Sequence, residues 1–317
     1  MTKPVKKRDI IEVKIDDLVY GGKGLARYND YVIFVKDSVP GQKLKVKIYK
    51  AKSSYAEAHP VEILEHSKLE KEPECPYFTH CGGCSHQNIA YEKQTEFKQK
   101  QVRDLYSRMG GFEDIDFEPI EPAEQTFRYR NKMEFAFSAK RWLMHDFEAD
   151  KPHNFALGLR APGHYWKAID LNDCLIAPAE TEKVLDIVRN YALENNLEPY
   201  NVRNHEGFLR HLVLRKAYQT NQLMIMILTN RDKPDKIAPL TDKLQNNLPN
   251  LHSFINAYTT NVGGTAVPEK THLLFGEEHI IEKIHGYEFV ISPASFFQTN
   301  SLMADNLYSI VQEKADL

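Results

Sequence analysis

Cysteine is scarce in this chain, with only four among 317 residues. No apolar run approaches the roughly twenty residues that span a bilayer. The basic start MTKPVKKRDI is not followed by the apolar segment of a secretory signal. These absences favour a reducing compartment, so we expect a cytoplasmic protein without disulfides or membrane contact. The sequence also lacks a GxGxxG loop that could cradle a nucleotide-type cofactor.

Charge is unevenly distributed along the chain, although the formal net charge is only -3. Residues 1–52 carry 13 Lys and Arg against 6 Asp and Glu, a net charge of +7, and the remainder has a net charge of -10. A basic first segment on an acidic body is typical of local contact with a polyanion. A solvated charged surface is an equally good explanation of the pattern.

Short runs of alternating apolar and polar residues fill positions 9–65, and glycine-containing turns separate them. Four or five short strands at this spacing predict a small closed barrel of the oligonucleotide-binding kind. A helix is expected at 88–111, with Val102, Leu105, Tyr106 and Met109 on its apolar face. From 127 onward, strand-like runs alternate with helices at 178–195 and about 233–247, and a last helix follows 300. This order predicts an antiparallel α+β domain.

Three cysteines, Cys75, Cys81 and Cys84, lie in CPYFTHCGGCSHQ, and Cys174 follows in LNDCLIA. Structural zinc usually takes two C-x2-C pairs, whereas three thiolates from one loop and one from elsewhere suit a cubane iron–sulfur cluster. We therefore favour [4Fe–4S] over zinc, over CxxC redox chemistry and over buried thiols. The neighbouring histidines are then expected outside the ligand set.

CPYFTHCGGCSHQ followed by YEKQTEFKQKQV resembles the iron–sulfur segment of RNA (uracil-5-)-methyltransferases. VYGGKGLARYNDYVIFVKDSVPGQ resembles the TRAM RNA-binding domain that precedes it in ribosomal-RNA members, and FRYRNKMEF, LGLR and SPASFFQTN match in order. The resemblance implies four parts: a TRAM barrel (1–66), an iron–sulfur loop and helix (67–111), a central α+β RNA-recognition domain (112–300) and a helix (301–317) leading to a Rossmann-like methyltransferase domain.

The chemistry implied by the resemblance is methylation of uridine C5 by S-adenosylmethionine after a cysteine thiolate adds to C6. Cys75, Cys81, Cys84 and Cys174 match the four cluster ligands, and the sequence holds no fifth cysteine. We therefore expect the catalytic domain to be missing from these residues and the 317-residue chain alone to be inactive. A stand-alone, non-catalytic RNA-binding iron–sulfur protein is the alternative.

Two residues of SPASFFQTN carry roles in the resemblance. Gln298 resembles the glutamine that contacts S-adenosylmethionine, and Phe296 resembles the phenylalanine near the target base. Without the resemblance, Phe296 is explained as a core aromatic residue and Gln298 as a helix cap.

The expected partner is RNA, with ribosomal RNA favoured because a TRAM barrel is present, and the protein is expected to be a monomer. Arg128, Arg130 and Lys132 alternate along a predicted strand, so they would share one face and could follow phosphates. A salt-bridged exposed face is the alternative. In the barrel, the further candidate RNA contacts are Lys23, Arg27 and Tyr31.

Overall fold

The computed structural model describes residues 4–144, 152–263 and 266–316. Its contacts divide the chain into two compact units, the first made of 1–79 and 83–124 and the second of 80–82 and 125–317. Each unit is described by itself. The four segments expected from the sequence are finer than this division and stay a prediction.

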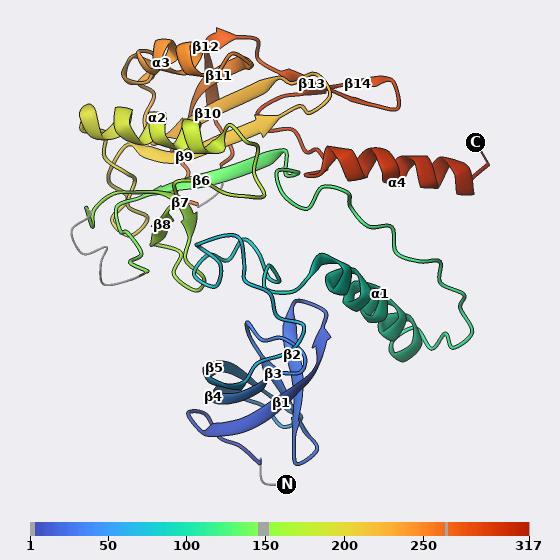
Figure 1. Cartoon of the computed structure of the whole chain (residues 1–317). Coiled ribbons are helices and arrows are strands. Elements are labelled where there is room, and N and C mark those ends of the chain that lie inside the picture. Colours follow the sequence, from blue (N-terminus) through green and yellow to red (C-terminus); the bar gives the residue numbers. More distant parts are fainter. Residues whose placement is uncertain (1–3, 145–151, 264–265, 317) are drawn as a thin grey trace. The chain divides into compact units, whose positions relative to one another are not determined.

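The first unit contains a closed five-stranded barrel, as the alternating pattern predicts (Figure 1). Neighbouring strands follow the order β1-β2-β3-β5-β4, and β4 pairs with β1 to close the barrel. Apolar residues of alternate positions fill its interior, which is how period-2 patterning buries one face of each strand. The strands are β1 (Ile10–Val19), β2 (Lys23–Tyr28), β3 (Tyr31–Val35), β4 (Lys43–Ala51) and β5 (Tyr55–Glu65).

Helix α1 (Tyr91–Arg108) completes the first unit. It contacts the barrel through Lys100, which pairs with Asp17, and Gln101, whose side chain donates to the Leu18 carbonyl at 3.2 Å. The apolar face predicted from periodicity is not a core face, because none of the helix residues is buried. Tyr106 instead packs at 5.4 Å against Phe117 of the segment that follows the helix.

The second unit is built on a seven-stranded sheet in the order β12-β11-β10-β9-β6-β7-β8 (Figure 1). Its pairs are antiparallel except β10 with β11, which are parallel because α3 carries the chain back between them. The antiparallel sheet expected from the sequence is therefore corrected at this one pair. The strands are β6 (Lys132–Ser138), β7 (Ala156–Arg160), β8 (Ala168–Asp170), β9 (Leu209–Lys216), β10 (Leu223–Thr229), β11 (Leu251–Tyr258) and β12 (Lys270–Gly276).

Helices α2 (Thr181–Glu194) and α3 (Leu240–Asn247) bury their apolar sides in this unit. The single helix predicted over 233–247 is divided into a 3-10 turn, Pro234–Lys236, and α3. The division is expected on physical grounds, since Pro239 precedes α3 and a proline within a helix removes a backbone hydrogen bond. A hairpin of β13 (Ile280–Ile284) and β14 (Tyr287–Ile291) leads to the last helix, α4 (Ser301–Lys314).

None of the helices in the described ranges is both long enough and apolar enough to cross a bilayer.

Candidate functional site

The segment SPASFFQTN connects β14 to α4 and presents its two candidate residues outward. Phe296 is 85% exposed, and Gln298 is also exposed. Between them, Phe297 turns inward and packs on the apolar cluster under the sheet. Asn300 caps α4 by accepting the Met303 amide at 3.1 Å, so the capping role belongs to Asn300 and not to Gln298. Phe296 is therefore not a core residue, and Gln298 is not the cap of α4.

Asn131 holds this segment from the central sheet. It is only 5% exposed, and its side-chain amide donates to the Gln298 carbonyl and to the Ser301 hydroxyl, both at 2.7 Å. The Asn131 backbone amide donates to the Thr299 carbonyl at 2.8 Å. One buried residue thus fixes three points on the path from Gln298 into α4.

Arg215 supplies a second attachment. Its guanidinium donates to the Ser295 carbonyl at 2.5 Å, next to Phe296, and Arg215 itself is 3% exposed on β9. Burial lowers the pKa of Arg215, while the nearby Glu134 carboxylate raises it. Asn131, directly before β6, and Arg215, on β9, therefore attach the two ends of the Phe296–Gln298 segment to the sheet, and we call this pair the loop clamp.

Sequence reasoning missed both clamp residues. In FRYRNKMEF, Asn131 lies between Arg130 and Lys132, and in this stretch only the cations are predicted from the sequence to contact RNA. The available signal was an uncharged polar side chain directly before a strand, which needs a hydrogen-bond partner if it is buried. The identity of that partner is a tertiary fact, since the contact joins residues 131 and 298.

The predicted row of Arg128, Arg130 and Lys132 on one strand face is wrong. β6 begins only at Lys132, and Arg128 has φ 56°, a left-handed conformation that an extended strand cannot contain. Arg128 makes a paired contact with Asp173, at 3.0 and 2.5 Å, which raises its pKa. Arg130 donates to the Lys132 carbonyl at 3.2 Å, and Lys132 pairs with Glu134 at 2.5 Å.

The four cysteines all lie in the described ranges, half-exposed and outside any disulfide. Cys75 and Cys84 belong to the first unit, and Cys81 and Cys174 to the second. Among the residues that the structure describes, no group of three or more His, Cys, Asp and Glu is gathered so that it could hold a metal ion. The iron–sulfur cluster is not confirmed and stays an expectation.

Arg128 is the neighbour of Cys174 that the structure shows most clearly. Arg128 donates to the Cys174 carbonyl at 3.2 Å. The pKa of Arg128 is raised chiefly by its hydrogen bond to Asp173, and the neighbouring Cys174 also contributes. Four cysteine thiols are the donor type that a [4Fe–4S] cluster takes, so the chemistry of the donor set fits the cluster. Its assembly is not seen among the described residues.

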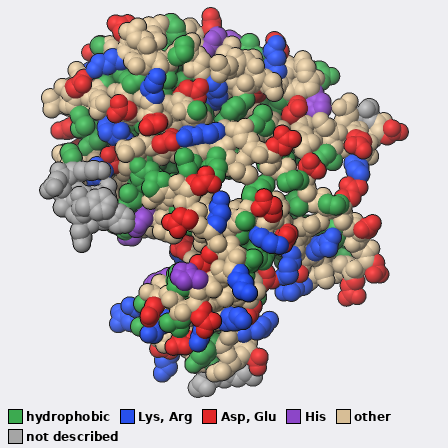
Figure 2. Space-filling model, in the orientation of Figure 1, with side chains coloured by type: hydrophobic (Ala, Val, Ile, Leu, Met, Phe, Trp, Pro, Cys, Tyr) green, Lys and Arg blue, Asp and Glu red, His purple; other side chains and the backbone are tan. Residues whose placement is uncertain are grey.

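The barrel candidates differ in how available they are. Lys23 pairs at 2.5 Å with Glu57, which is buried and also accepts from Tyr49 at 2.7 Å and from Lys50. These donors, led by Lys23, lower the pKa of Glu57 to about 2. Arg27 is exposed on a barrel surface on which Lys and Arg side chains are interspersed with acids (Figure 2).

Tyr31 is largely buried, which leaves little of its side chain accessible for the RNA contact predicted from the sequence. It is 8% exposed within the barrel core, and its hydroxyl donates to the carbonyls of Lys52 at 2.7 Å and Tyr55 at 2.6 Å. The ring position on a period-2 strand faces inward, so the hydroxyl finds partners inside the protein.

The chain resembles a known domain family and known proteins. A family model described as TRAM domain matches residues 4–61, which is the barrel. An uncharacterized RNA methyltransferase of Chlorobaculum tepidum is 36% identical over 310 residues, covering 96% of this chain and 64% of that protein. Another, from Caldanaerobacter subterraneus, is 35% identical over 311 residues, covering 98% of this chain and 67% of that protein. The chain belongs to the RNA methyltransferase family.

The fold has a solved counterpart. The crystal structure of a tRNA (uracil-54, C5)-methyltransferase from Pyrococcus abyssi, in complex with S-adenosyl-L-homocysteine, matches with a TM-score of 0.70 at 24% identity. The match covers 95% of this chain and 64% of that one. The chain thus spans about two thirds of the length of this structure and of the two curated relatives. The resemblance inferred from the sequence is confirmed at the level of the family and its TRAM barrel.

Proposed function

We propose that this chain is the RNA-binding and iron–sulfur portion of an S-adenosylmethionine-dependent ribosomal-RNA uracil-5-methyltransferase of the 23S type, which forms 5-methyluridine. The observation that carries the proposal is the clamped segment in a member of the RNA methyltransferase family. It presents an 85% exposed phenylalanine, Phe296, two residues from Gln298. An exposed aromatic ring held on a fixed backbone suits stacking against a base that has left its helix.

In this proposal Gln298 contacts S-adenosylmethionine and Phe296 lies beside the target uridine. The reaction needs a thiolate to add to C6, because C5 of uracil is a poor nucleophile until that addition occurs. All four cysteines of these residues are assigned to the cluster. We therefore expect no methyl transfer from the 317-residue chain by itself.

Cys75, Cys81, Cys84 and Cys174 would hold a [4Fe–4S] cluster, which when bound would provide a cross-link between segments or a redox centre. Anaerobic purification is expected to yield a brown protein with iron and sulfide and broad absorbance near ~400 nm. Cys174→Ser should lower the iron content, whereas the control Ser309→Ala, on the exposed side of α4, should leave it unchanged. A colourless protein with stoichiometric zinc and no iron would refute the cluster.

RNA binding is tested with an rRNA fragment and a tRNA of matched length, followed by fluorescence anisotropy at increasing salt. We expect affinity that falls with salt and favours the rRNA fragment, because exposed cations such as Arg27 release counterions from phosphates. Tighter binding of tRNA would overturn the rRNA assignment while leaving the family intact. Transfer of a radioactive methyl group by the purified chain would overturn the assignment of its cysteines.

A further inference from the structure

Both tryptophans of the chain lie in one surface of the second unit. Trp142 and His164 have ring centroids 4.7 Å apart, and His164 meets Trp166 edge to face at 5.3 Å. Tyr165 meets Trp166 edge to face at 5.2 Å and is itself 63% exposed. We call these four side chains the aromatic row.

Short connections to the sheet fix the row in place. The Trp142 amide donates to the Ala168 carbonyl at 2.8 Å, and the Ser138 hydroxyl donates to the Trp166 carbonyl at 3.1 Å. Between them, Arg141 is buried and pairs at 2.9 Å with Asp170 of β8. Because both ends of the row are tied to β6 and β8, its rings are ordered before any ligand arrives, which reduces the entropy lost on binding.

Cations line the row on several sides. The Lys167 ammonium lies 5.2 Å from the centre of the Trp142 ring, and the exposed Arg203 guanidinium lies 4.2 Å from the centre of the Trp166 ring. In the part of the chain that the structure describes, neither Lys167 nor the exposed Lys140 forms an ion pair with a carboxylate. Their charges are therefore available to an anionic ligand.

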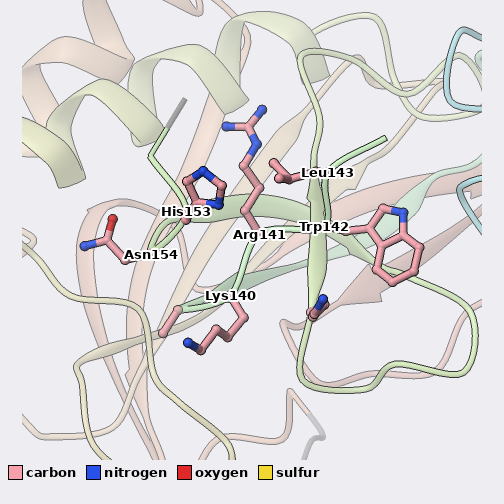
Figure 3. A pocket seen from close by; sticks show the side chains of 8 residues that line it. Lys140, Arg141, Trp142, Leu143, His153 and Asn154 are labelled. Atoms are coloured by element: carbon pink, nitrogen blue, oxygen red, sulfur yellow. The ribbon is translucent and has the colours of Figure 1, made fainter. Parts of the chain in front are cut away.

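A pocket of about 400 Å³ adjoins the row (Figure 3). In Figure 3 the Trp142 ring extends to one side of it, while Lys140, His153 and Asn154 lie on the other. Among the residues that the structure describes, the lining includes Lys140, Arg141, which pairs with Asp170, and Lys167, and it includes no aspartate or glutamate. Trp142 is partly exposed. An accessible aromatic ring beside cations is the combination that binds single-stranded nucleic acid, in which bases stack on rings and phosphates contact cations.

We propose that the aromatic row is a binding site for single-stranded RNA, with Tyr165 stacking on an unpaired base and Lys140 and Lys167 contacting the adjacent phosphates. The inference rests on the proposed function, since it supplies an RNA contact besides the barrel and the clamped segment. The site would bind a single-stranded part of the substrate RNA, because the bases of a duplex stack on each other and leave no free face for Tyr165.

The experiment uses the whole chain and a single-stranded RNA of about ten nucleotides, a length within the range that one such surface spans. Binding is followed at once by anisotropy of the labelled RNA and by intrinsic tryptophan emission, which comes only from the row because the chain has two tryptophans. We expect quenching of this emission by the single strand and none by a duplex of the same sequence.

Tyr165→Ala should raise the Kd by about 5-fold to about 150-fold, the range for loss of one stacked base. Tyr165→Phe keeps the ring and should leave the Kd unchanged. Tyr287→Ala is the matched control, since Tyr287 is likewise exposed, at 72%, but lies on β14. Lys140→Ala should make the salt dependence of binding shallower by about one phosphate contact.

The outcomes separate this inference from the proposed function. Suppose that anisotropy shows salt-dependent binding, that tryptophan emission does not change, and that Tyr165→Ala and Tyr287→Ala have the same Kd. This result would overturn the aromatic row as a site and leave RNA binding by the chain intact. An absence of any anisotropy change at low salt would overturn both. Quenching that Tyr165→Phe abolishes would also contradict stacking, because that variant retains the ring.

Discussion

Replacing Asn131 by alanine is expected to release the segment that presents Phe296 and Gln298. The change removes two side-chain hydrogen bonds of 2.7 Å, to the Gln298 carbonyl and the Ser301 hydroxyl. Each bond contributes about 1 kcal/mol, and Ser301, which is 3% exposed, would be left with a buried hydroxyl lacking this partner. We therefore expect the second unit to lose about 2 to 3 kcal/mol of unfolding free energy.

Urea unfolding monitored by tryptophan emission is the suitable assay, because Trp142 and Trp166 both belong to the second unit. Ser301→Ala and the double variant complete a thermodynamic cycle with Asn131→Ala. The coupling between the two positions should be about 1 kcal/mol, since the direct bond is lost only once in the double variant. Limited proteolysis should also cut the segment at Phe296 faster in Asn131→Ala than in the unmodified protein.

Asn190→Ala is the control for this prediction. Asn190 also donates from its side chain, to Asp186 at 3.1 Å, but the bond lies on the exposed side of α2. Its loss should change the unfolding free energy by less than about 0.5 kcal/mol. If Asn131→Ala were as mild as Asn190→Ala, and proteolysis at Phe296 were unchanged, the loop clamp would be refuted.

Two further predictions concern pH. Burial, together with the charges of Arg160 and Arg210, lowers the pKa of His211 from 6.5 to about 4. The unfolded chain therefore binds the proton at higher pH than the folded chain does. As pH falls from about 6.5 to about 4, the second unit should lose up to about 3 kcal/mol of unfolding free energy. His211→Gln should flatten that loss in urea midpoints, and equal pH slopes would contradict it. In the barrel, the lowered pKa of Glu57 gives stability that is complete above about 4.5 and lost as pH falls toward about 2. Glu57→Gln should lower the unfolding free energy of the barrel by about 1 to 2 kcal/mol at neutral pH; the loss is limited because Lys23 and Lys50 are partly solvated, which weakens their ion pairs. Unchanged amide hydrogen exchange of the barrel strands would refute this prediction.

Much of the fold follows from local patterning. The barrel strands, α2 and α4 form where alternation or helical spacing predicts them, because these patterns report which side of each element can be buried. Helix α1 also forms where it is predicted, although none of its residues is buried. The errors occur where a neighbour outside the local window decides. Arg128 lies outside the predicted strand and pairs with Asp173. The Tyr31 hydroxyl donates to the carbonyls of Lys52, in the turn before β5, and Tyr55, at the start of β5.

By itself, the sequence determined the TRAM barrel, the α+β class and the cysteine and SPASFFQTN motifs that lead to the RNA methyltransferase family. These features are carried by residues close together in the chain, where spacing and residue type suffice. Only the tertiary structure decided how Phe296 is presented and where the aromatic row lies. The clamp joins residue 131 to residue 298, and the row joins 142 to 164–166 and 203. Such contacts depend on which strands pair, and local periodicity carries no information about partners so distant in the chain.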